Sequence, residues 1–355
     1  MGIQGRKGRI VVGMSGGVDS AVAAYLLKEA GFEVIGVTLR TWESGSSKCC
    51  ELDEARQTAR KQEIPYHAWN AVELFHERVV LPFLDDYVHG RTPNPCVECN
   101  RYVKWAQLLH IADVMGADRV ATGHYASVVS LGNGRLALRQ AADEKKDQSY
   151  MLYKLTQEQL ARTVLPLGEW TKAEVRAIAE RAGMSVAHKE DSQEICFVTD
   201  GSYADYIEKE AGRGPFPTGN FVDEDGKILG QHRGIIHYTV GQRKGLGIAL
   251  GHPAYVKRID AARNEVVIGD DRSLYAREIF CGSPVFMGIP DPGEGDRFPA
   301  RVRIRYRHGG EKAVLERCRD GIRIFFEKPV RAPAPGQSAV FYDEDGCVMG
   351  GGKIT

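Results

Sequence analysis

A short segment near the N-terminus combines two glycines, two serines and a carboxylate. This segment, residues 15–20 (SGGVDS), follows the apolar run RIVVGM and precedes a stretch with helical spacing. A turn between a strand and a helix directs backbone N–H groups and the positive end of the helix dipole toward one point, which suits a phosphate. Asp19 would repel a bare phosphate, so it indicates a bound Mg²⁺ or a role in positioning a reacting nucleotide. The spacing matches neither of the common glycine-rich nucleotide loops.

Three cysteines form a second group with possible chemistry. Cys96 and Cys99 lie in a segment rich in proline and asparagine, TPNPCVECN, just before a predicted helix. A thiol near a helix N-terminus is expected to have a lowered pKa, which favours the thiolate. One CxxC can be half of a zinc site, a redox pair or part of an iron–sulfur site. Because a second CxxC is absent, the structural zinc site is the weaker interpretation.

Cys196 lies far along the chain in DSQEICF, but folding could bring it to the CxxC pair. Three cysteines could hold three corners of a [4Fe–4S] cluster and leave one iron open. Equally, two of them could act as a persulfide donor and a resolving thiol. A buried core position is the alternative for Cys196, since Ile195 and Phe197 flank it. The other cysteines are expected to be packing or incidental residues: Cys49, Cys50, Cys281, Cys318 and Cys347.

The elements that must position these residues alternate in the first half of the chain. We expect strands at 9–14, 33–39, 65–69 and 120–122, and helices at 21–30, 53–62, 102–115 and 171–183. Such alternation predicts a parallel sheet with helices on both faces. The nucleotide loop would then follow the first strand.

The pattern changes after about residue 203. Asp-Gly pairs at 225–226, 320–321 and 345–346 are flanked by β-rich segments and predict hairpins. In the segment 301–307 (RVRIRYR), strict alternation predicts a strand with four arginines on one face. We therefore expect three domains: an α/β catalytic domain at 1–202, a small central domain at 203–276 and a β-barrel at 277–355.

Composition limits the classes of protein that the chain can belong to. A length of 355 residues predicts two or three domains, and 43% hydrophobic with 26% charged residues is typical of globular proteins. No apolar run is long enough to span a bilayer, and the N-terminus lacks a signal-peptide pattern, so we expect a cytoplasmic protein without a membrane partner. A formal net charge of zero argues against nucleic acid. However, residues 296–331 contain eleven Lys/Arg and five Asp/Glu, which is a local positive excess.

Taken together, these segments resemble the tRNA-specific 2-thiouridylase (MnmA) family. The loop SGGVDS is similar to the signature of PP-loop ATP pyrophosphatases, which release pyrophosphate and leave AMP on the substrate. Segments similar to the family's occur in the family's order over nearly the whole chain: GMSGGVDSAVAAYLL, GRTPNPCVECNRYVKW, ATGHYA, KKDQSYMLY, DSQEICF, HYTVGQRKGLGI, RVRIRYR and APGQSAVFY. The resemblance implies a PP-loop domain, a small central tRNA-binding domain and a C-terminal β-barrel.

The resemblance also implies a reaction. The family transfers sulfur to C2 of the wobble uridine, position 34, in tRNAs for Lys, Glu and Gln. In that reaction the C2 oxygen attacks the α-phosphate of ATP and pyrophosphate leaves; sulfur then attacks C2 and AMP departs. The implied ligands and partners are ATP with Mg²⁺, tRNA, and a sulfur donor protein or sulfide source. We expect the chain to bind tRNA as a monomer.

Site residues follow from the same resemblance. The ATP site would be formed by Gly13, Met14, Ser15, Gly16, Gly17, Val18, Asp19 and Ser20, with Leu39 and Gly123. Cys99 corresponds to the catalytic nucleophile and Cys196 to the persulfide-bearing cysteine, and Asp19 would assist the reacting nucleotide. The target base would contact Asn94, Pro95 and Cys96. Contacts to tRNA are implied for His124, Lys146, Asp147, Gln148, Arg305, Tyr306 and Gln337, and the arginines of 301–307 then become candidate phosphate contacts.

One position departs from the family pattern. Some members have Asp where this chain has Cys96. The substitution leaves a Cys99/Cys196 persulfide route intact, but it supplies a third soft ligand, which favours a [4Fe–4S] cluster on Cys96, Cys99 and Cys196. In the cluster version the open iron would hold the attacking sulfide, and Cys99 would not be a free nucleophile.

Two other classes of function use part of the same motifs. A PP-loop ligase that adenylates a carboxylate would share the loop, but amide formation does not need three cysteines. A zinc-dependent RNA-binding module would bind nucleotide without releasing pyrophosphate. The cysteine pattern therefore favours sulfur transfer over both.

Overall fold

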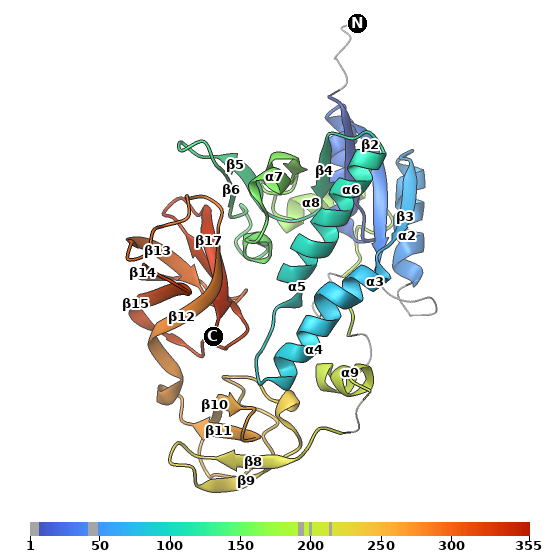
Figure 1. The fold of residues 1–355 in the computed structure, drawn as a ribbon. Helices are drawn as coiled ribbons and strands as arrows, with labels where there is room; N and C mark the ends of the chain where they lie inside the picture. The colour runs from blue at the N-terminus through green and yellow to red at the C-terminus, as the bar shows by residue number, and fades with distance from the viewer. Residues whose placement is uncertain (1–6, 42–48, 191–194, 199–200, 213–214) are drawn as a thin grey trace, which may run out of the picture.

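Three regions follow one another along the chain (Figure 1): an α/β region, a small four-stranded sheet and a closed β-barrel. The computed structural model describes residues 7–41, 49–190, 195–198, 201–212 and 215–355. In Figure 1 the barrel, in orange and red, lies beside the blue and green α/β region, and the small sheet lies below both. The predicted fold class is confirmed. In the described part of the chain, no helix has both the length and the apolar character that crossing a membrane requires.

Five parallel strands form the sheet of the α/β region, in the order β3-β2-β1-β4-β7. The strands are β1 Arg9–Gly13, β2 Glu33–Arg40, β3 Tyr66–Asn70, β4 Arg119–Thr122 and β7 Thr163–Val164. Parallel neighbours need crossover connections, which helices supply here. The helices packed near the sheet are α1 Val18–Glu29, α2 Cys49–Lys61, α6 Ala106–Val114 and α8 Lys172–Arg181.

Side chains alternate between two apolar layers along each central strand, as the period of a strand requires. On one face Val11 packs in a cluster with Leu108 of α6. On the other face Ile10 packs in a cluster with Leu27 of α1. Both faces are therefore covered, which explains why the strands are continuous apolar runs.

Two long helical runs lead toward the candidate cysteines. The first contains α3 Val72–Phe75, the π-helix η1 His76–Val80 and α4 Leu81–Val88. The second contains α5 Pro95–Glu98, the π-helix η2 Cys99–Trp105 and α6. The prediction that the second helix begins near Tyr102 is wrong, because Asn94 caps an earlier turn and Pro95 occupies its first position.

A hairpin and three short helices connect the sheet with the rest of the chain. The hairpin is β5 Ser127–Ser130 with β6 Leu136–Arg139, and an isolated bridge joins Arg139 to Cys347 of the barrel region. The short helices are η3 Ser149–Leu152, α7 Gln157–Ala161 and α9 Tyr203–Glu210. α8 begins at the predicted capping box, in which Thr171 and Glu174 bond each other's backbone.

The second half contains two β structures. The small sheet has the order β10-β11-β8-β9, with β8 Gly219–Val222, β9 Ile228–His232, β10 Tyr255–Asp260 and β11 Glu265–Gly269. The closed barrel has the order β12-β15-β14-β13-β16-β17, with β12 Tyr275–Phe286, β13 Arg297–Arg303, β14 Glu311–Cys318, β15 Gly321–Arg331, β16 Ser338–Tyr342 and β17 Val348–Ile354. Two short helical turns, η4 Ile235–His237 and η5 Arg272–Leu274, lie outside these strands. All three Asp-Gly pairs join neighbouring antiparallel strands, as predicted.

The segment 301–307 does not form the predicted strand with four exposed arginines. β13 ends at Arg303, and the chain bends and turns over residues 304–307. Arg301 and Arg307 are exposed, but Arg303 is only 8% exposed. A guanidinium is buried here because a carboxylate from the other region meets it, which a pattern within the strand could not reveal.

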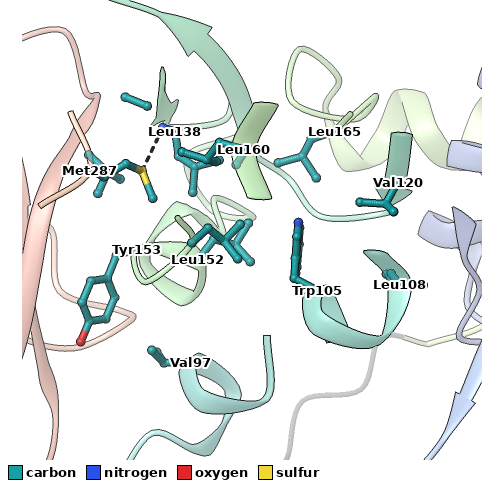
Figure 2. Packing of buried hydrophobic residues seen from close by; sticks show 14 of the residues in the cluster. Val97, Trp105, Leu108, Val120, Leu138, Leu152, Tyr153, Leu160, Leu165 and Met287 are labelled. Carbon is teal, nitrogen blue, oxygen red and sulfur yellow. Dashed lines mark hydrogen bonds between the residues drawn. The ribbon is translucent and has the colours of Figure 1, made fainter. Parts of the chain in front are cut away.

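That carboxylate is Asp147, which is 2% exposed. Arg303 Nη1 donates to Asp147 Oδ2 at 2.6 Å, and the second carboxylate oxygen accepts from the backbone N–H groups of Ala141 and Ser149. Around this ion pair lies an apolar cluster shared by the two regions (Figure 2), in which Met287 contacts the α/β side through Leu138. A buried ion pair and a shared apolar cluster therefore dock the barrel on the α/β region.

Substitution of Arg303 by Met tests the contribution of the buried ion pair. Removing one partner leaves a desolvated carboxylate, so we expect the free energy of unfolding to fall by about 3–5 kcal/mol. Arg301→Met on the same strand removes an exposed charge and should change it by less than about 0.5 kcal/mol. Urea unfolding followed by the intrinsic fluorescence of the four tryptophans, of which Trp105 is fully buried, measures both. Equal effects of the two substitutions would contradict the docking role.

Candidate active site

The segment SGGVDS forms a closed loop between β1 and α1. Gly16 has φ +73°, a conformation that glycine adopts without strain. Ser15 N donates to Ser20 Oγ at 3.1 Å, and Ser20 Oγ donates to Gly17 O at 3.1 Å. Met14 is held by neighbouring β2, since Thr38 Oγ1 donates to Met14 O at 2.6 Å. Gly17 caps α1 without a side chain, so the first N–H groups of the helix have no side-chain cap.

The Asp19 carboxylate has two hydrogen-bond partners within the protein. Tyr125 Oη donates to Asp19 Oδ1 at 2.8 Å, and Lys172 Nζ donates to the same oxygen at 2.7 Å. Lys172 is 9% exposed and is the first residue of α8. The ammonium neutralises the carboxylate and adds a cation beside the loop, which lowers the repulsion that a phosphate would meet there. Sequence reasoning identified the cap before Lys172 but not the lysine itself.

Gly123 lies directly against the loop. A Cβ atom on Gly123 would lie 2.6 Å from Asp19 C and 2.6 Å from Ser20 N, so only glycine fits. Lys189 approaches from another side: its Nζ donates to Gly16 O at 3.3 Å and pairs with Glu54. Leu39 lies near the end of β2 and packs against two apolar clusters. The loop therefore has two lysines and a close-packed glycine around it, and the lysines were missed from the sequence.

The CxxC pair begins the second helical run. Asn94 Oδ1 accepts from Cys96 N at 3.2 Å, and Pro95 is buried in the first turn. Cys99 is 7% exposed and belongs to an apolar cluster with Phe75 and Phe83. Burial raises the pKa of the Cys99 thiol to about 12 and also raises the pKa of Cys96, although nearby Lys104 acts in the opposite direction. The expectation of lowered thiol pKa values is therefore wrong for this conformation, because desolvation outweighs the favourable charge.

Cys196 lies beside the pair. Its neighbours Ile195 and Phe197 pack on the cluster that contains Cys99, and the Phe197 ring lies 5.1 Å from that of Phe83. Cys196 is near enough to Cys96 and Cys99 to raise the pKa of both thiols electrostatically, so the three lie in the same region of the fold. The alternative of a buried core position is wrong, since Cys196 is exposed.

The three cysteines are free thiols, and their arrangement can be compared with a ligand set. Among the residues that the structure describes, no three His, Cys, Asp or Glu side chains are grouped as a metal site. Cys99 is buried while Cys196 is exposed, so the thiols differ in their access to solvent. A [4Fe–4S] cluster on Cys96, Cys99 and Cys196 stays a prediction. Cys49 and Cys50 belong to the start of α2, but their side chains lie outside the described residues, whereas Cys281 and Cys347 are buried as expected.

Lys104 is a further residue that sequence reasoning missed. It follows Cys99 by five positions inside η2, and a π-helix closes its turns with i→i+5 bonds, so Lys104 lies one turn along from Cys99. Its charge also acts on His124. The only signal in the sequence was a lysine within a predicted helix, which is usually a solvated position.

His124 and Gln148, which were predicted to contact tRNA, connect the side of the site that contains the CxxC pair with the nucleotide loop. His124 Nδ1 lies 2.7 Å from Thr122 Oγ1, and its ring is 5.5 Å from that of Trp105. Burial, reinforced by Lys104, lowers the pKa of His124 well below its usual value, so the imidazole is neutral at pH 7. Gln148 Oε1 accepts from Tyr125 N at 3.0 Å, and Gln148 N donates to Tyr125 O at 2.8 Å. Gln148 thus orients Tyr125, which bonds Asp19.

The remaining predicted tRNA residues have different environments. Lys146, Arg305 and Tyr306 are partly exposed, and Arg305 Nη1 donates to Arg331 O at 3.0 Å. The Asp147 carboxylate is buried in its ion pair with Arg303. Gln337 Nε2 donates to Thr92 O at 2.9 Å. In the described conformation Asp147 is therefore the buried member of this group, and the other four are partly exposed.

Comparison with known protein families covers nearly the whole chain. Residues 8–200 match the family described as tRNA methyl transferase HUP domain, residues 205–270 the tRNA methyl transferase PRC-barrel domain, and residues 276–354 the aminomethyltransferase beta-barrel domain. The chain is 51% identical over 357 residues to the tRNA-specific 2-thiouridylase MnmA of Lachnoclostridium phytofermentans, covering 98% of this chain and 99% of that one. It is 48% identical over 362 residues to the protein of the same name from Acetivibrio thermocellus, with 98% and 99% covered.

Solved structures are more distant. The U34-tRNA thiolase NcsA from Methanococcus maripaludis with its [4Fe–4S] cluster is 20% identical with a TM-score of 0.38, covering 59% of this chain and 69% of that one. A 4-thiouridine synthetase–RNA complex with bound ATP is 17% identical with a TM-score of 0.37, covering 58% and 50%. Likeness at this level says nothing about how the cysteines of this chain act.

Alkylation tests the contrast between the exposed and the buried thiol. At pH 8 a thiol with a pKa of about 12 is ionised in only about one molecule in 10⁴, so iodoacetamide should label Cys196 well before Cys99. Peptide mass spectrometry of timed samples measures both rates, and unfolding in urea should make them similar. If folded protein is labelled at Cys99 as fast as at Cys196, the burial described for Cys99 is wrong.

Proposed function

Because the chain belongs to the tRNA-specific 2-thiouridylase family, we propose that it replaces the C2 oxygen of wobble uridine 34 by sulfur in an ATP-dependent reaction. The substrates are the tRNAs for Lys, Glu and Gln, and the products are 2-thiouridine, AMP and pyrophosphate. The observation that carries the proposal is the packing of Phe197 on the Cys99 cluster, which brings Cys196 beside the CxxC helix. Methyl transfer, which two of the family descriptions name, would use neither this pair of thiols nor the nucleotide loop.

The nucleotide loop supports the adenylation step. The O2 atom of the uridine attacks the α-phosphate of ATP; an O–P bond forms, and the bond from that phosphorus to pyrophosphate breaks. Gly13 through Ser20 would surround the phosphates, with Leu39 and Gly123 along the nucleotide. Lys172 and Lys189 lie beside the loop and would neutralise the charge of the triphosphate. Mg²⁺ would bind chiefly through phosphate oxygens, since Asp19 is the only carboxylate placed within the loop.

The cysteines support sulfur delivery by a persulfide. Cys196 is exposed, so a sulfur donor protein that carries a persulfide can reach it. The Cys196 thiolate attacks the outer sulfur of that persulfide, the donor's S–S bond breaks, the donor leaves as a thiol and Cys196 becomes the persulfide. Its terminal sulfur attacks C2, a C–S bond forms, the C2–O bond breaks and AMP leaves with the oxygen. The Cys99 thiolate then attacks Sγ of Cys196, which breaks the S–S bond, releases 2-thiouridine and leaves a Cys99–Cys196 disulfide. A dithiol reductant must return both cysteines to thiols before the next cycle.

This route requires a change at the buried thiol. Cys99 has to lose its proton and reach Cys196, so the apolar cluster around it must open when substrate binds. Lys104 is placed to stabilise the thiolate once desolvation is relieved. The target base would enter at Asn94, Pro95 and Cys96, at the start of the same helix. Binding of tRNA would use Lys146, Arg305, Tyr306 and neutral His124, and it should weaken with salt because phosphate contacts displace counterions.

Single cysteine substitutions separate the persulfide route from a cluster. Cys99→Ser and Cys196→Ser should reduce tRNA thiolation to the background rate, because each removes a sulfur that the balance of the reaction requires. Cys96→Ser should remain active, and anaerobically purified wild type should contain no stoichiometric iron. Thiolated tRNA is quantified by retardation in mercury-containing gels, and iron by metal analysis.

The opposite results discriminate between the two routes. Stoichiometric iron together with an inactive Cys96→Ser variant would replace the persulfide route by a cluster while leaving thiolation in place. Repeated turnover by Cys196→Ser would refute both routes.

The close packing of Gly123 tests the nucleotide loop. Gly123→Ala must displace the backbone of Asp19 and Ser20, so tRNA-dependent pyrophosphate release should fall by about tenfold or more. Gly132→Ala is a matched control, because a Cβ there meets nothing within 4 Å, and its rate should stay within about twofold of wild type. Equal rates for the two variants would show that ATP does not use this loop.

A further inference from the structure

Residues at the end of the barrel bind the segment of chain just before the CxxC helix, which is the helical run that begins with α5. Asp86, near the end of α4, is 4% exposed and accepts from two cations. Lys353 of β17 donates to its carboxylate oxygens at 2.6 and 2.8 Å, and Arg91 Nε donates to it at 2.6 Å. An acid of the α/β region is thus buried between a cation of its own loop and a cation of the barrel.

A second set of contacts lies a few residues further along. Thr92 N donates to Pro335 O at 2.7 Å, and Gln337 Nε2 donates to Thr92 O at 2.9 Å and to Pro93 O at 3.4 Å. Between them Gly336 has φ +94°, and a Cβ there would lie 2.8 Å from Thr92 N. The barrel chain therefore reaches the backbone of Thr92 at a position where only glycine leaves room.

These contacts hold the segment that leads into the CxxC helix. Pro93 is followed by Asn94, whose side chain caps the helix at Cys96, and Cys99 lies one turn further. In Figure 1 the chain between α4 and α5 runs along the side of the α/β region that faces the barrel, and the C-terminus lies close by. Side chains from β17 and the turn before β16 thus hold the loop that leads into the Asn94 cap and the helix.

We propose that Gln337 and Lys353 are positioning residues for the sulfur-transfer site. They hold residues 91–94 so that Cys96 and Cys99 meet the adenylated base in one fixed orientation. Gln337 acts through Thr92, since its amide N–H is directed at two backbone carbonyls of this loop. A buried ion pair suits this task, because burial makes its geometry specific even where its net stabilisation is small. The effect on rate rests on the proposed thiolation; the effect on the helix start does not.

The experiment compares Gln337→Met and Lys353→Met with Lys353→Arg and with Arg323→Met. Both Met variants keep an unbranched side chain but remove the donor; Lys353→Arg keeps a donor, and Arg323 is a partly exposed barrel residue paired with Glu278. Three quantities are measured in each: the kcat of tRNA thiolation, the Kd for tRNA, and amide hydrogen exchange over residues 95–99.

For the two Met variants we expect kcat to fall by about tenfold or more, because small misplacement of reacting groups is costly. Their tRNA Kd should stay within about twofold of wild type, and exchange over 95–99 should speed up. Lys353→Arg should recover most of the rate, and Arg323→Met should match wild type. If Lys353→Met fails to fold, Gln337→Met decides alone, because it leaves the buried ion pair intact.

Two results would overturn the proposal. A weaker tRNA Kd with unchanged kcat in Gln337→Met would make Gln337 a tRNA contact. Unchanged hydrogen exchange over 95–99 in both Met variants would show that the barrel does not determine the helix start. If wild type fails to thiolate tRNA, the proposed function fails, and the exchange measurement still decides the positioning role.

Discussion

The docking of the barrel on the α/β region is the constraint on which the site depends. Its polar centre is the ion pair between Asp147 and Arg303, which is costly to desolvate. Backbone N–H groups of Ala141 and Ser149 satisfy the carboxylate, whereas the buried Arg303 Nε has no hydrogen-bond partner among the described residues. Asp147 adjoins Gln148, which orients Tyr125, and Tyr125 bonds Asp19 in the nucleotide loop. The ion pair is therefore connected to the nucleotide loop through one peptide bond and a short series of hydrogen bonds.

The two halves of the site are ordered by different physical means. Charge orders the nucleotide half, where lysines pair with carboxylates beside a closed glycine loop. Apolar packing orders the sulfur half, where Phe197 and Phe83 bring Cys196 beside a helix that buries Cys99. Burial raises the pKa of the Cys99 thiol and so keeps it protonated, which lowers its reactivity toward oxidants in this conformation. A polar half and an apolar half suit a reaction that handles a triphosphate first and a sulfur nucleophile second.

Local patterns predicted those parts of the fold that depend on local physics. Apolar β-branched runs predicted strands of the parallel sheet, and three Asp-Gly pairs marked hairpin turns, because each turn needs only its own residues to adopt its conformation. The start of the CxxC helix was placed too late, since the first turns carry polar residues and a π-helix that no period of 3.6 describes. The alternation of 301–307 failed because a distant carboxylate buries Arg303.

By itself the sequence determined the family and the fold class, and it singled out the glycine-rich loop and three cysteines as candidate site residues, because these depend on residue type and order along the chain. Only the tertiary structure decided which groups meet: Lys172 with Asp19, Lys104 near Cys99, and Gln337 with Thr92. It also decided that Cys99 is buried and its pKa raised while Cys196 is exposed. Burial and charge pairing depend on residues that are far apart in the chain, so no local sequence pattern reveals them.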